Sequence, residues 1–296
     1  MVTSPAPPGS GHPAVIVFLT DFGLRDPYVG ICHAVIAGIA PHVRVIDLSH
    51  GVPPQDVRAG ALMLLDSLPY LPPGVVLAVV DPGVGTRRRS VAVSAGPGPR
   101  PRWFVGPDNG VLAPAIEAAG GAGAAWHIEH PPQVGGQRSD TFHGRDLFAP
   151  AAALLAAGGD PAALGRPLPV QTLTRISFPS PEVGAGDLMA EVLMVDRFGT
   201  LALSARARDL DGAGLRIGDP LHVRAGGRER PARAVFGRTF ADAAPGEVVV
   251  LLDSAGRVAV AVNGDSAAQR LGVGPGDSVR LSRAGSEPGG RQHRRP

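Results

Sequence analysis

The sequence predicts an α/β fold in which an N-terminal, mostly parallel sheet with flanking helices precedes a small C-terminal β-barrel domain. In the first half, short apolar runs alternate with helix-like segments, as in a sheet covered on both faces. After about Gly158 the helical patterns stop, and short strand-like runs separated by glycine-containing turns follow. A chain of 296 residues also gives a soft expectation of two domains, at about 150 residues each.

The elements of the first half are predicted from runs of apolar residues and from the residues that start and stop helices. Asp26 is expected to cap the first helix with Pro27 as its first residue, and the Pro-Pro-Gly of residues 72–74 ends the second helix. The predicted strands are residues 15–20, 43–48, 75–80, 90–94 and 103–105. The predicted helices are residues 26–40, 56–68, 111–119 and 146–157.

The second half is predicted to be all β, with a Pro-rich linker in front of it. Its predicted strands are residues 187–196, 201–204, 220–224, 247–252, 258–262 and 278–281. The domain organisation that follows is a flexible leader (1–14), an α/β domain (15–165), a linker (166–186), a barrel domain (187–283) and a basic tail (284–296).

Composition excludes several classes of chemistry. All 28 basic residues are arginine, so no lysine is present for a Schiff base, a pyridoxal phosphate anchor or a phosphate-binding P-loop. Cys32 is the only cysteine, which excludes disulfides and zinc knuckles within one chain. The histidines lack a ligand spacing such as HExxH, so no metal site is predicted. The net charge is +2 and the charges balance outside the tail, which argues against nucleic acid as a partner.

No membrane partner is predicted either. No apolar run reaches the length of a membrane-spanning helix. Residues 1–13 carry neither a basic region nor an apolar core, so they do not form a signal peptide. The expected location is therefore the cytoplasm.

Three polar clusters, residues 20–23, 81–88 and 141–146, are predicted to follow strands of the first domain. Ligand sites in open α/β sheets gather beyond the carboxyl ends of the strands. In an extended segment, Arg88 would point away from Arg87 and Arg89 and could turn inward. His143, between Phe142 and a glycine, is expected to be partly buried.

Each cluster also has a plainer interpretation. Asp21 alone could be a turn or cap residue. The segment DPGVGT (81–86) could be a phosphate nest or simply a tight loop, and three consecutive arginines are usually a solvated surface. In the second domain, residues 196–200 and 262–265 could be no more than hairpin turns.

Taken together, these residues resemble the S-adenosyl-L-methionine (SAM) hydroxide adenosyltransferases, the SAM hydrolases related to fluorinase and chlorinase. The matching stretches are TDFGLRDPYVG (20–30), IDLSHGVPPQDVRAGALML (46–64), VVDPGVGTRRR (79–89), FVGPDNGVL (104–112), TFHGRDLFAP (141–150), VDRFGTL (195–201) and DSAGRVAVAVNGDSA (253–267). The resemblance implies the same two-domain fold. It also implies a homotrimer with substrate sites at the subunit interfaces, SAM as the substrate, adenosine and L-methionine as products, and no cofactor.

The resemblance also implies roles for individual residues. Asp81, Arg88 and His143 would handle the nucleophilic water, with Arg88 stabilising its hydroxide character. Asp21 would bind the ribose hydroxyls. The remaining residues implied in substrate binding are Asp26, Asp196 and Ser254 at the methionine end, and Phe198, Thr200, Asn263 and Gly264 around the adenine. Thr200 stands where the family usually has Asn, and Ala255 where the halogenases have Arg.

The predicted reaction is in-line attack of water or hydroxide on the ribose C5′ of SAM. One alternative is a SAM-dependent halogenase. Asp81 stands where halogenases have an aromatic residue and Val84 where fluorinase has a halide-binding hydroxyl, so both residues favour water as the nucleophile. The other alternative is a SAM- or adenosine-binding module with little turnover, which the departures at Thr200 and Ala255 leave open.

Overall fold

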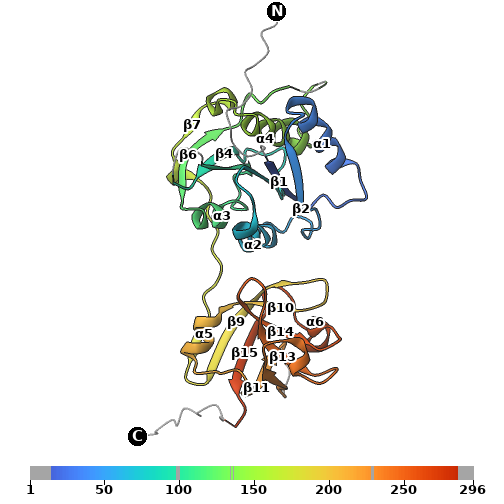
Figure 1. The fold of residues 1–296 in the computed structure, drawn as a ribbon, viewed down its shortest axis with the longest axis vertical. Helices are drawn as coiled ribbons and strands as arrows, with labels where there is room; N and C mark the ends of the chain where they lie inside the picture. The colour runs from blue at the N-terminus through green and yellow to red at the C-terminus, as the bar shows by residue number, and fades with distance from the viewer. Residues whose placement is uncertain (1–14, 98–100, 134, 136, 228–229, 286–296) are drawn as a thin grey trace, which may run out of the picture. The chain divides into compact units, whose positions relative to one another are not determined.

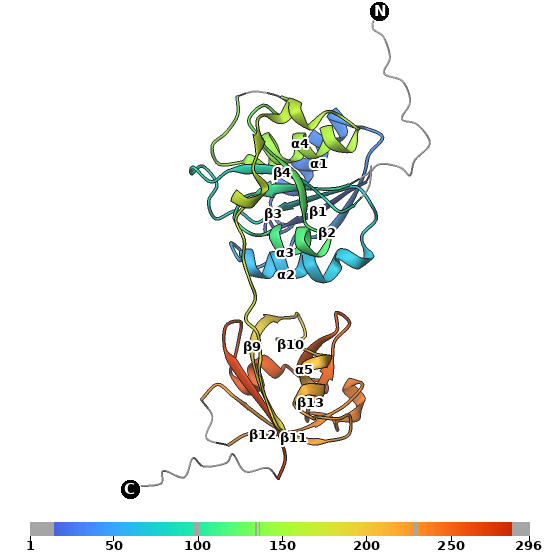
Figure 2. The same cartoon turned by 90° about the vertical axis from the view of Figure 1, so that its left-hand side faces the viewer.

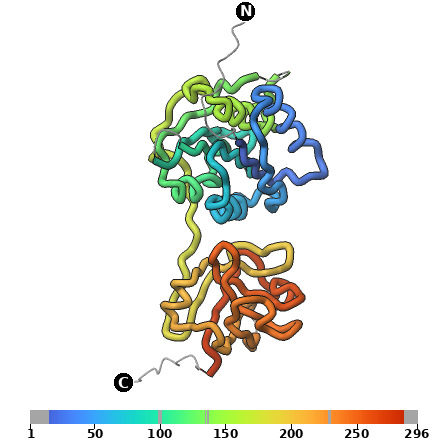
Figure 3. Tube along the Cα trace, viewed as in Figure 1, coloured from blue at the N-terminus to red at the C-terminus, as the bar shows by residue number. Residues whose placement is uncertain are grey.

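The computed structural model describes residues 15–97, 101–133, 135, 137–227 and 230–285. The chain forms two compact units, Met1–Ser177 and Phe178–Pro296. In Figure 3 the blue-to-yellow trace forms the first unit and the remaining yellow-to-red trace forms the second. The predicted leader lies outside the described residues, as does the predicted tail beyond Gly285.

The first unit is built on one mixed sheet. Its strands are β1 (Val15–Thr20), β2 (Arg44–Ser49), β3 (Val75–Val79), β4 (Ser90–Ala95), β5 (Arg102–Pro107), β6 (Ala122–His127) and β7 (Pro167–Leu168), in the order β2-β1-β3-β5-β4-β6-β7. The pairings among β2, β1, β3 and β5 are parallel, whereas β4 pairs antiparallel with β5 and β6, and β6 antiparallel with β7. The predicted α/β class is confirmed, but only half of the sheet is parallel. The short connection between β4 and β5 has no room for the crossover that a parallel pair needs.

Helices cover both faces of this sheet. They are α1 (Tyr28–Ile39), α2 (Val57–Ser67), α3 (Ala113–Ala118) and α4 (Ala149–Ala156). Figures 1 and 2 show α1 and α4 on one face and α2 and α3 on the other. All six residues of β1 are buried, because this strand lies between the two helical layers. Each face has its own apolar core.

The first two helices start in different ways. Asp56 caps α2, accepting a hydrogen bond from the backbone N–H of Ala59. The prediction that Asp26 caps α1 was wrong. Pro27 itself occupies the capping position and the helix begins at Tyr28, with no side-chain cap.

The predicted helix 146–157 consists of two parts. A π-helical turn, Gly144–Phe148, leads directly into α4. Such turns are rare and frequently occur at functional sites. This turn begins immediately after His143.

The second unit is a closed barrel, which confirms the prediction. Its strands are β8 (Glu182–Gly184), β9 (Asp187–Val195), β10 (Leu201–Arg206), β11 (Pro220–Ala225), β12 (Ala232–Phe236), β13 (Val248–Leu252), β14 (Arg257–Val262) and β15 (Ser278–Arg283). The order is β10-β14-β13-β12-β11-β15-β9-β8, and a further β10–β9 pairing closes the ring. Two short helices, α5 (Ala207–Gly212) and α6 (Ala267–Leu271), accompany the strands. The barrel interior is filled by Leu, Val and Ala side chains.

Two short strands lie within the segment predicted as a linker. β7 pairs with β6 in the first unit, and β8 pairs with β9 in the second. The domain bounds inferred from sequence stay a prediction. Across the part of the chain that the structure describes, we find no helix with the length and apolar character needed to cross a membrane.

Candidate active site

Asp81, Arg88 and His143 form one hydrogen-bonded cluster in the first unit. Asp81 follows β3, Arg88 precedes β4, and His143 lies immediately before the π-helical turn. The expectation that the cluster at 141–146 follows a strand was wrong, because β6 ends at His127 and this cluster leads directly into the turn. Nε of Arg88 donates to Oδ1 of Asp81 at 2.8 Å, and Nη2 contacts Oδ2 of the same carboxylate. Nη2 also lies 2.8 Å from Nδ1 of His143. The structure therefore brings together three residues that are up to 62 positions apart in the sequence.

The cluster is shielded from solvent. Only 10% of the Arg88 side chain and 6% of the Asp81 side chain are exposed. The ring of Phe148, from the π-helical turn, lies under the Arg88 guanidinium at 5.1 Å and contacts the His143 ring edge-on. Low exposure strengthens the electrostatic interaction between the two charged groups.

Every N–H group of Arg88 has a partner. A guanidinium has five N–H donors. Besides the three directed at Asp81 and His143, Nη1 donates to Oγ of Ser90 at 2.7 Å and to the carbonyl of Arg89 at 3.3 Å. The inward orientation expected for Arg88 is confirmed, whereas Arg87 is exposed. Arg89 instead pairs with Asp108 and Thr172.

The protonation state of His143 follows from its partner. Arg88 can only donate, so Nδ1 of His143 must accept, and the proton of the neutral ring is on Nε2. Burial lowers the pKa of His143 below its usual value, and the nearby Arg88 charge lowers it further. At neutral pH the ring is therefore neutral and presents an Nε2–H donor.

Asp21 lies in the loop after β1 and is held by a residue that the sequence analysis did not identify. Its Oδ2 accepts a hydrogen bond of 2.7 Å from the backbone N–H of Gln55. Gln55 has φ +66°, and among the described residues it is the only non-glycine with a positive φ. A backbone conformation of this kind carries strain, and such strain clusters at functional sites. Its position just before the α2 cap gave no signal in the sequence.

An aromatic cluster joins the Asp21 loop to the His143 segment. Phe22, Tyr28 and Phe142 contact one another edge-on or tilted, with ring centroids 5.1–6.0 Å apart. A Cβ atom on Gly144 would lie 2.9 Å from Cζ of Phe22, so glycine permits this close approach. Asp26 is exposed in the turn that precedes α1.

The other predicted binding residues lie on turns of the second unit. Oδ1 of Asp196 accepts from the backbone N–H groups of Phe198 and Thr200, both at 2.8 Å. The Phe198 side chain is largely exposed, at 73%. The backbone carbonyl of Gly199 accepts from the N–H of Ala268, so this loop packs beside the segment that follows β14.

That neighbouring segment contains Asn263 and Gly264. The side-chain amide of Asn263 donates to the carbonyl of Ala243 at 2.8 Å, and Gly264 has φ +81°. Ser254 is exposed in the turn between β13 and β14. Residues 196–200 therefore form the predicted hairpin turn between β9 and β10, whereas residues 262–265 form a turn that leads from β14 into α6 and not a hairpin. Both turns present backbone groups on the surface of the barrel, and the first also presents Phe198.

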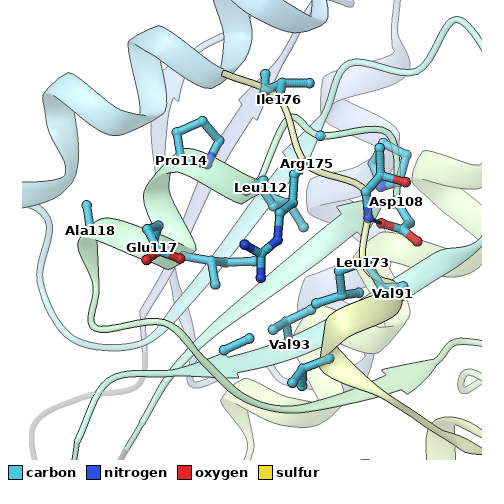
Figure 4. Close-up of a pocket in the computed structure, with 17 residues that line it drawn as sticks. Val91, Val93, Asp108, Leu112, Pro114, Glu117, Ala118, Leu173, Arg175 and Ile176 are labelled. Carbon is cyan, nitrogen blue, oxygen red and sulfur yellow. Dashed lines mark hydrogen bonds between the residues drawn. The ribbon is translucent and has the colours of Figure 1, made fainter. Parts of the chain in front are cut away.

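A cavity of about 480 Å³ lies elsewhere in the first unit. Figure 4 shows its lining side chains, which come from β4, from the α3 region and from the segment around Arg175. None of the predicted site residues lines it. Its walls are mostly aliphatic, with Asp108, Glu117 and Arg175 as the charged members, so it lacks the buried acid–base cluster found around Arg88.

Two family models match most of this chain. Residues 16–165 match the model of the SAM hydroxide adenosyltransferase N-terminal domain, and residues 190–280 match that of the C-terminal domain. The chain is 48% identical over 267 residues to an (R)-S-adenosyl-L-methionine hydrolase of Salinispora tropica, covering 90% of this chain and 97% of the relative. A fluorinase of Nocardia brasiliensis is 30% identical, covering 92% and 98%.

A solved structure, described as an uncharacterised conserved protein from Thermotoga maritima, superposes with a TM-score of 0.82 at 35% identity, covering 90% of this chain and all of that one. The resemblance noted in the sequence is confirmed by these matches to both domains. The chain belongs to the SAM hydroxide adenosyltransferase family.

Proposed function

We propose that this protein hydrolyses SAM to adenosine and L-methionine. The observation that carries the proposal is the buried Asp81–Arg88–His143 cluster, in a chain 48% identical to a SAM hydrolase. The cluster combines an acceptor, a fixed cation and a neutral donor, which together can orient one water molecule. SAM supplies the reactive carbon and a leaving group that is already activated.

The reaction needs only one bond to form and one to break. The water oxygen attacks C5′ of the ribose while the C5′–S bond breaks, and its electron pair stays on sulfur as the thioether of methionine. As the water gives up a proton, its oxygen gains hydroxide character, and this negative charge is lost together with the positive charge of the sulfonium, so charge is dispersed in the transition state. A site with little water favours such a transition state over the separated charges. The water also loses one proton, to an acceptor in the site.

The hydrogen bonds of the cluster support one division of these tasks. Nε2–H of His143 donates to the water oxygen, and a carboxylate oxygen of Asp81 accepts one of its protons. Because all five N–H groups of Arg88 have protein partners, Arg88 acts through its charge and by positioning its two neighbours. This refines the sequence-based expectation, in which Arg88 stabilises the hydroxide character of the water, by giving the direct contacts with the water to His143 and Asp81.

Substrate binding is assigned to the remaining residues. Asp21, with one oxygen held by Gln55, has its other oxygen for the ribose hydroxyls. Phe198 stacks on the adenine, and Thr200, Asn263 and Gly264 line the adenine edge. Asp26, Asp196 and Ser254 bind the methionine end. Because Oδ1 of Asp196 already accepts two backbone N–H groups, Asp196 binds the methionine ammonium through its other oxygen.

The proposal extends to the oligomeric state, location and cofactor use of the enzyme. We infer a homotrimer with active sites at subunit interfaces, a cytoplasmic location and no cofactor. The assignment of binding residues to two units supports shared sites, and size-exclusion chromatography with light scattering measures the assembly directly.

A labelled-water experiment tests the reaction. Purified protein is incubated with SAM and chloride in H₂¹⁸O, and the products are resolved by liquid chromatography with mass detection. Adenosine carrying ¹⁸O at the 5′-hydroxyl, with unlabelled methionine, is expected. Chlorinated adenosine would instead identify a halogenase, which the fluorinase relative makes the relevant second candidate. Unchanged SAM with calorimetric binding would identify a binding module.

A further inference from the structure

A second cluster of ligand-type side chains lies beside the Asp21 loop. It consists of His33 on α1, Asp47 on β2 and His50 just after β2. Nε2 of each histidine approaches Oδ1 of Asp47, at 2.8 Å from His33 and 3.0 Å from His50. One ligand atom from each residue falls within 4.8 Å of the other two. None of these residues is among those assigned to SAM.

The orientation of His50 is not that of a hydrogen-bond donor to Asp47. Its side chain is only 3% exposed, and its buried Nε2 makes no hydrogen bond despite lying 3.0 Å from Oδ1 of Asp47. The nitrogen is therefore directed beside the carboxylate oxygen and not at it. Ligand atoms that converge on a common ion have this relation: they are about 3 Å apart and each is directed at the ion.

The opposite nitrogen of His50 supports the same interpretation. Nδ1 lies 2.9 Å from Oγ1 of Thr20. If Nδ1–H donates to this oxygen, the lone pair of Nε2 faces the carboxylate, which is unfavourable unless a cation lies between them. Metal-binding histidines typically donate their second ring N–H to an oxygen acceptor, which holds the ring in place. Phe18 packs against both imidazole rings, at 4.9 Å from His50 and 6.0 Å from His33, and restrains them further.

We propose that His33, Asp47 and His50 bind a divalent transition metal ion of the zinc class. Two imidazole nitrogens and one carboxylate oxygen suit Zn²⁺ and its neighbours, whereas Mg²⁺ and Ca²⁺ prefer oxygen ligands. The side chains of His33 and Asp47 are 35% and 44% exposed, which leaves access for the ion and for a water as the fourth ligand. The ion replaces the proton that His33 donates to Asp47.

The metal would brace the Asp21 loop. The backbone N–H of Gly23 donates to the carbonyl of His50 at 2.8 Å, and that of Phe22 donates to Oγ1 of Thr20 at 3.1 Å. Both ends of the loop therefore depend on the position of His50. A metal-bound His50 holds the loop in place, so the ion stabilises the first unit whether or not SAM is turned over.

Direct metal binding tests the proposal. The full chain, prepared without a histidine tag and treated with a chelator, is titrated with Co²⁺ and followed by visible absorption. Zn²⁺ affinity is then measured by competition with a chromophoric chelator. We expect one ion per chain, the intense visible bands of a low-coordinate cobalt site, and a higher melting temperature with Zn²⁺.

Matched variants locate the site. His33→Gln and Asp47→Asn are expected to weaken Zn²⁺ binding at least about tenfold and to abolish the Zn²⁺-induced rise in melting temperature. His42→Gln changes an exposed histidine outside the cluster and should leave both unchanged. Both cluster variants alter partly exposed side chains, and circular dichroism without metal checks that they fold.

Two outcomes would overturn the proposal. One is the absence of Zn²⁺ binding and of visible cobalt bands in the wild-type chain. The other is binding of equal affinity in wild type, His33→Gln and Asp47→Asn, which would place the ion elsewhere. Neither measurement uses SAM, so failure here is distinct from failure of the proposed hydrolase activity.

Discussion

The two units present their predicted functional residues in opposite ways. In the first unit, Asp81, Arg88 and His143 are largely buried, and side chains bond to side chains. In the second, the corresponding residues lie on exposed turns, where Asp196 bonds to backbone and Phe198 is 73% exposed. Burial makes the first set rigid before substrate arrives, which is the requirement for orienting a small nucleophile. The second set offers surface that a ligand or another chain can cover.

Replacing Arg88 is the strongest test of this contrast between buried and exposed functional residues. Arg88→Gln should lower kcat about 100- to 1000-fold with little change in KM, because the variant loses the charge and the positioning of Asp81 and His143. Arg87→Gln, at the exposed neighbouring position, should retain activity. Steady-state kinetics with adenosine detection measures both.

Fold integrity must be checked for Arg88→Gln, because breaking a buried ion pair can cost about 3–5 kcal/mol of stability. A melting curve and a SAM-binding isotherm provide this check. Asp81→Asn keeps the side-chain shape and should also lower kcat. Full activity in a folded Arg88→Gln variant would remove the cluster from the mechanism.

Substitutions of the exposed residues in the second unit should change substrate binding and not the chemical step. Phe198→Ala is expected to raise KM by about 5- to 150-fold, the range of one base–aromatic stack, with a smaller change in kcat. Because the ring is mostly exposed, the melting temperature should not fall. A fall in kcat at constant KM would show that the two sets are not divided in this way.

The burial of His143 predicts the acid side of the pH profile. Its pKa is held below the usual value of 6.5, so the neutral donor persists to lower pH and kcat/KM should decline only below that value. His143→Asn can still accept from Arg88 but does not titrate, so its profile should lack this decline. A decline with the same midpoint in the variant would assign the titration to another group.

The lowered pKa of His143 also affects the stability of the fold. Between the lowered folded pKa and the unfolded pKa near 6.5, the unfolded chain binds more protons at this position than the folded chain. The contribution of His143 to stability is therefore present above pH 6.5 and is lost as the pH falls toward the folded pKa. Urea unfolding of wild type and His143→Asn at several pH values measures the difference.

The smallest effect is expected at Gln55. Gln55→Gly keeps the backbone N–H that binds Asp21 and removes the steric penalty of φ +66°. The free energy of unfolding should change by less than about 1 kcal/mol, because relief of strain is offset by the greater entropy of the unfolded glycine. A large loss of SAM affinity in this variant would show that the Gln55 side chain contacts the substrate.

Much of the fold could be predicted from local sequence. The apolar run of β1, the second helix and the glycine-separated strands of the barrel all gave clear signals. β6 was missed because AGAAWH is mostly alanine and glycine, and this segment is a strand only because it pairs with β4 and β7. β12 and the short β8 gave equally weak signals.

For the candidate sites, too, some residues could be predicted from the sequence and others could not. Asp81, Arg88 and His143 were predicted through resemblance to a family, since nothing local relates Arg88 to a histidine 55 residues away. The prediction that no metal site exists rested on spacing along the chain. Spacing does not reveal His33 and Asp47, which meet only when α1 packs on the sheet beside β2.

The sequence alone determined which residues could be buried, where turns and caps occur, and which chemistry the absence of lysine excludes. These are local properties of side chains and backbone. Only the tertiary structure decided that Gln55 holds Asp21, that all N–H groups of Arg88 are occupied, and that His50 faces Asp47 without a hydrogen bond. Such contacts depend on distances and angles between distant segments, and those are set when helices and strands pack together.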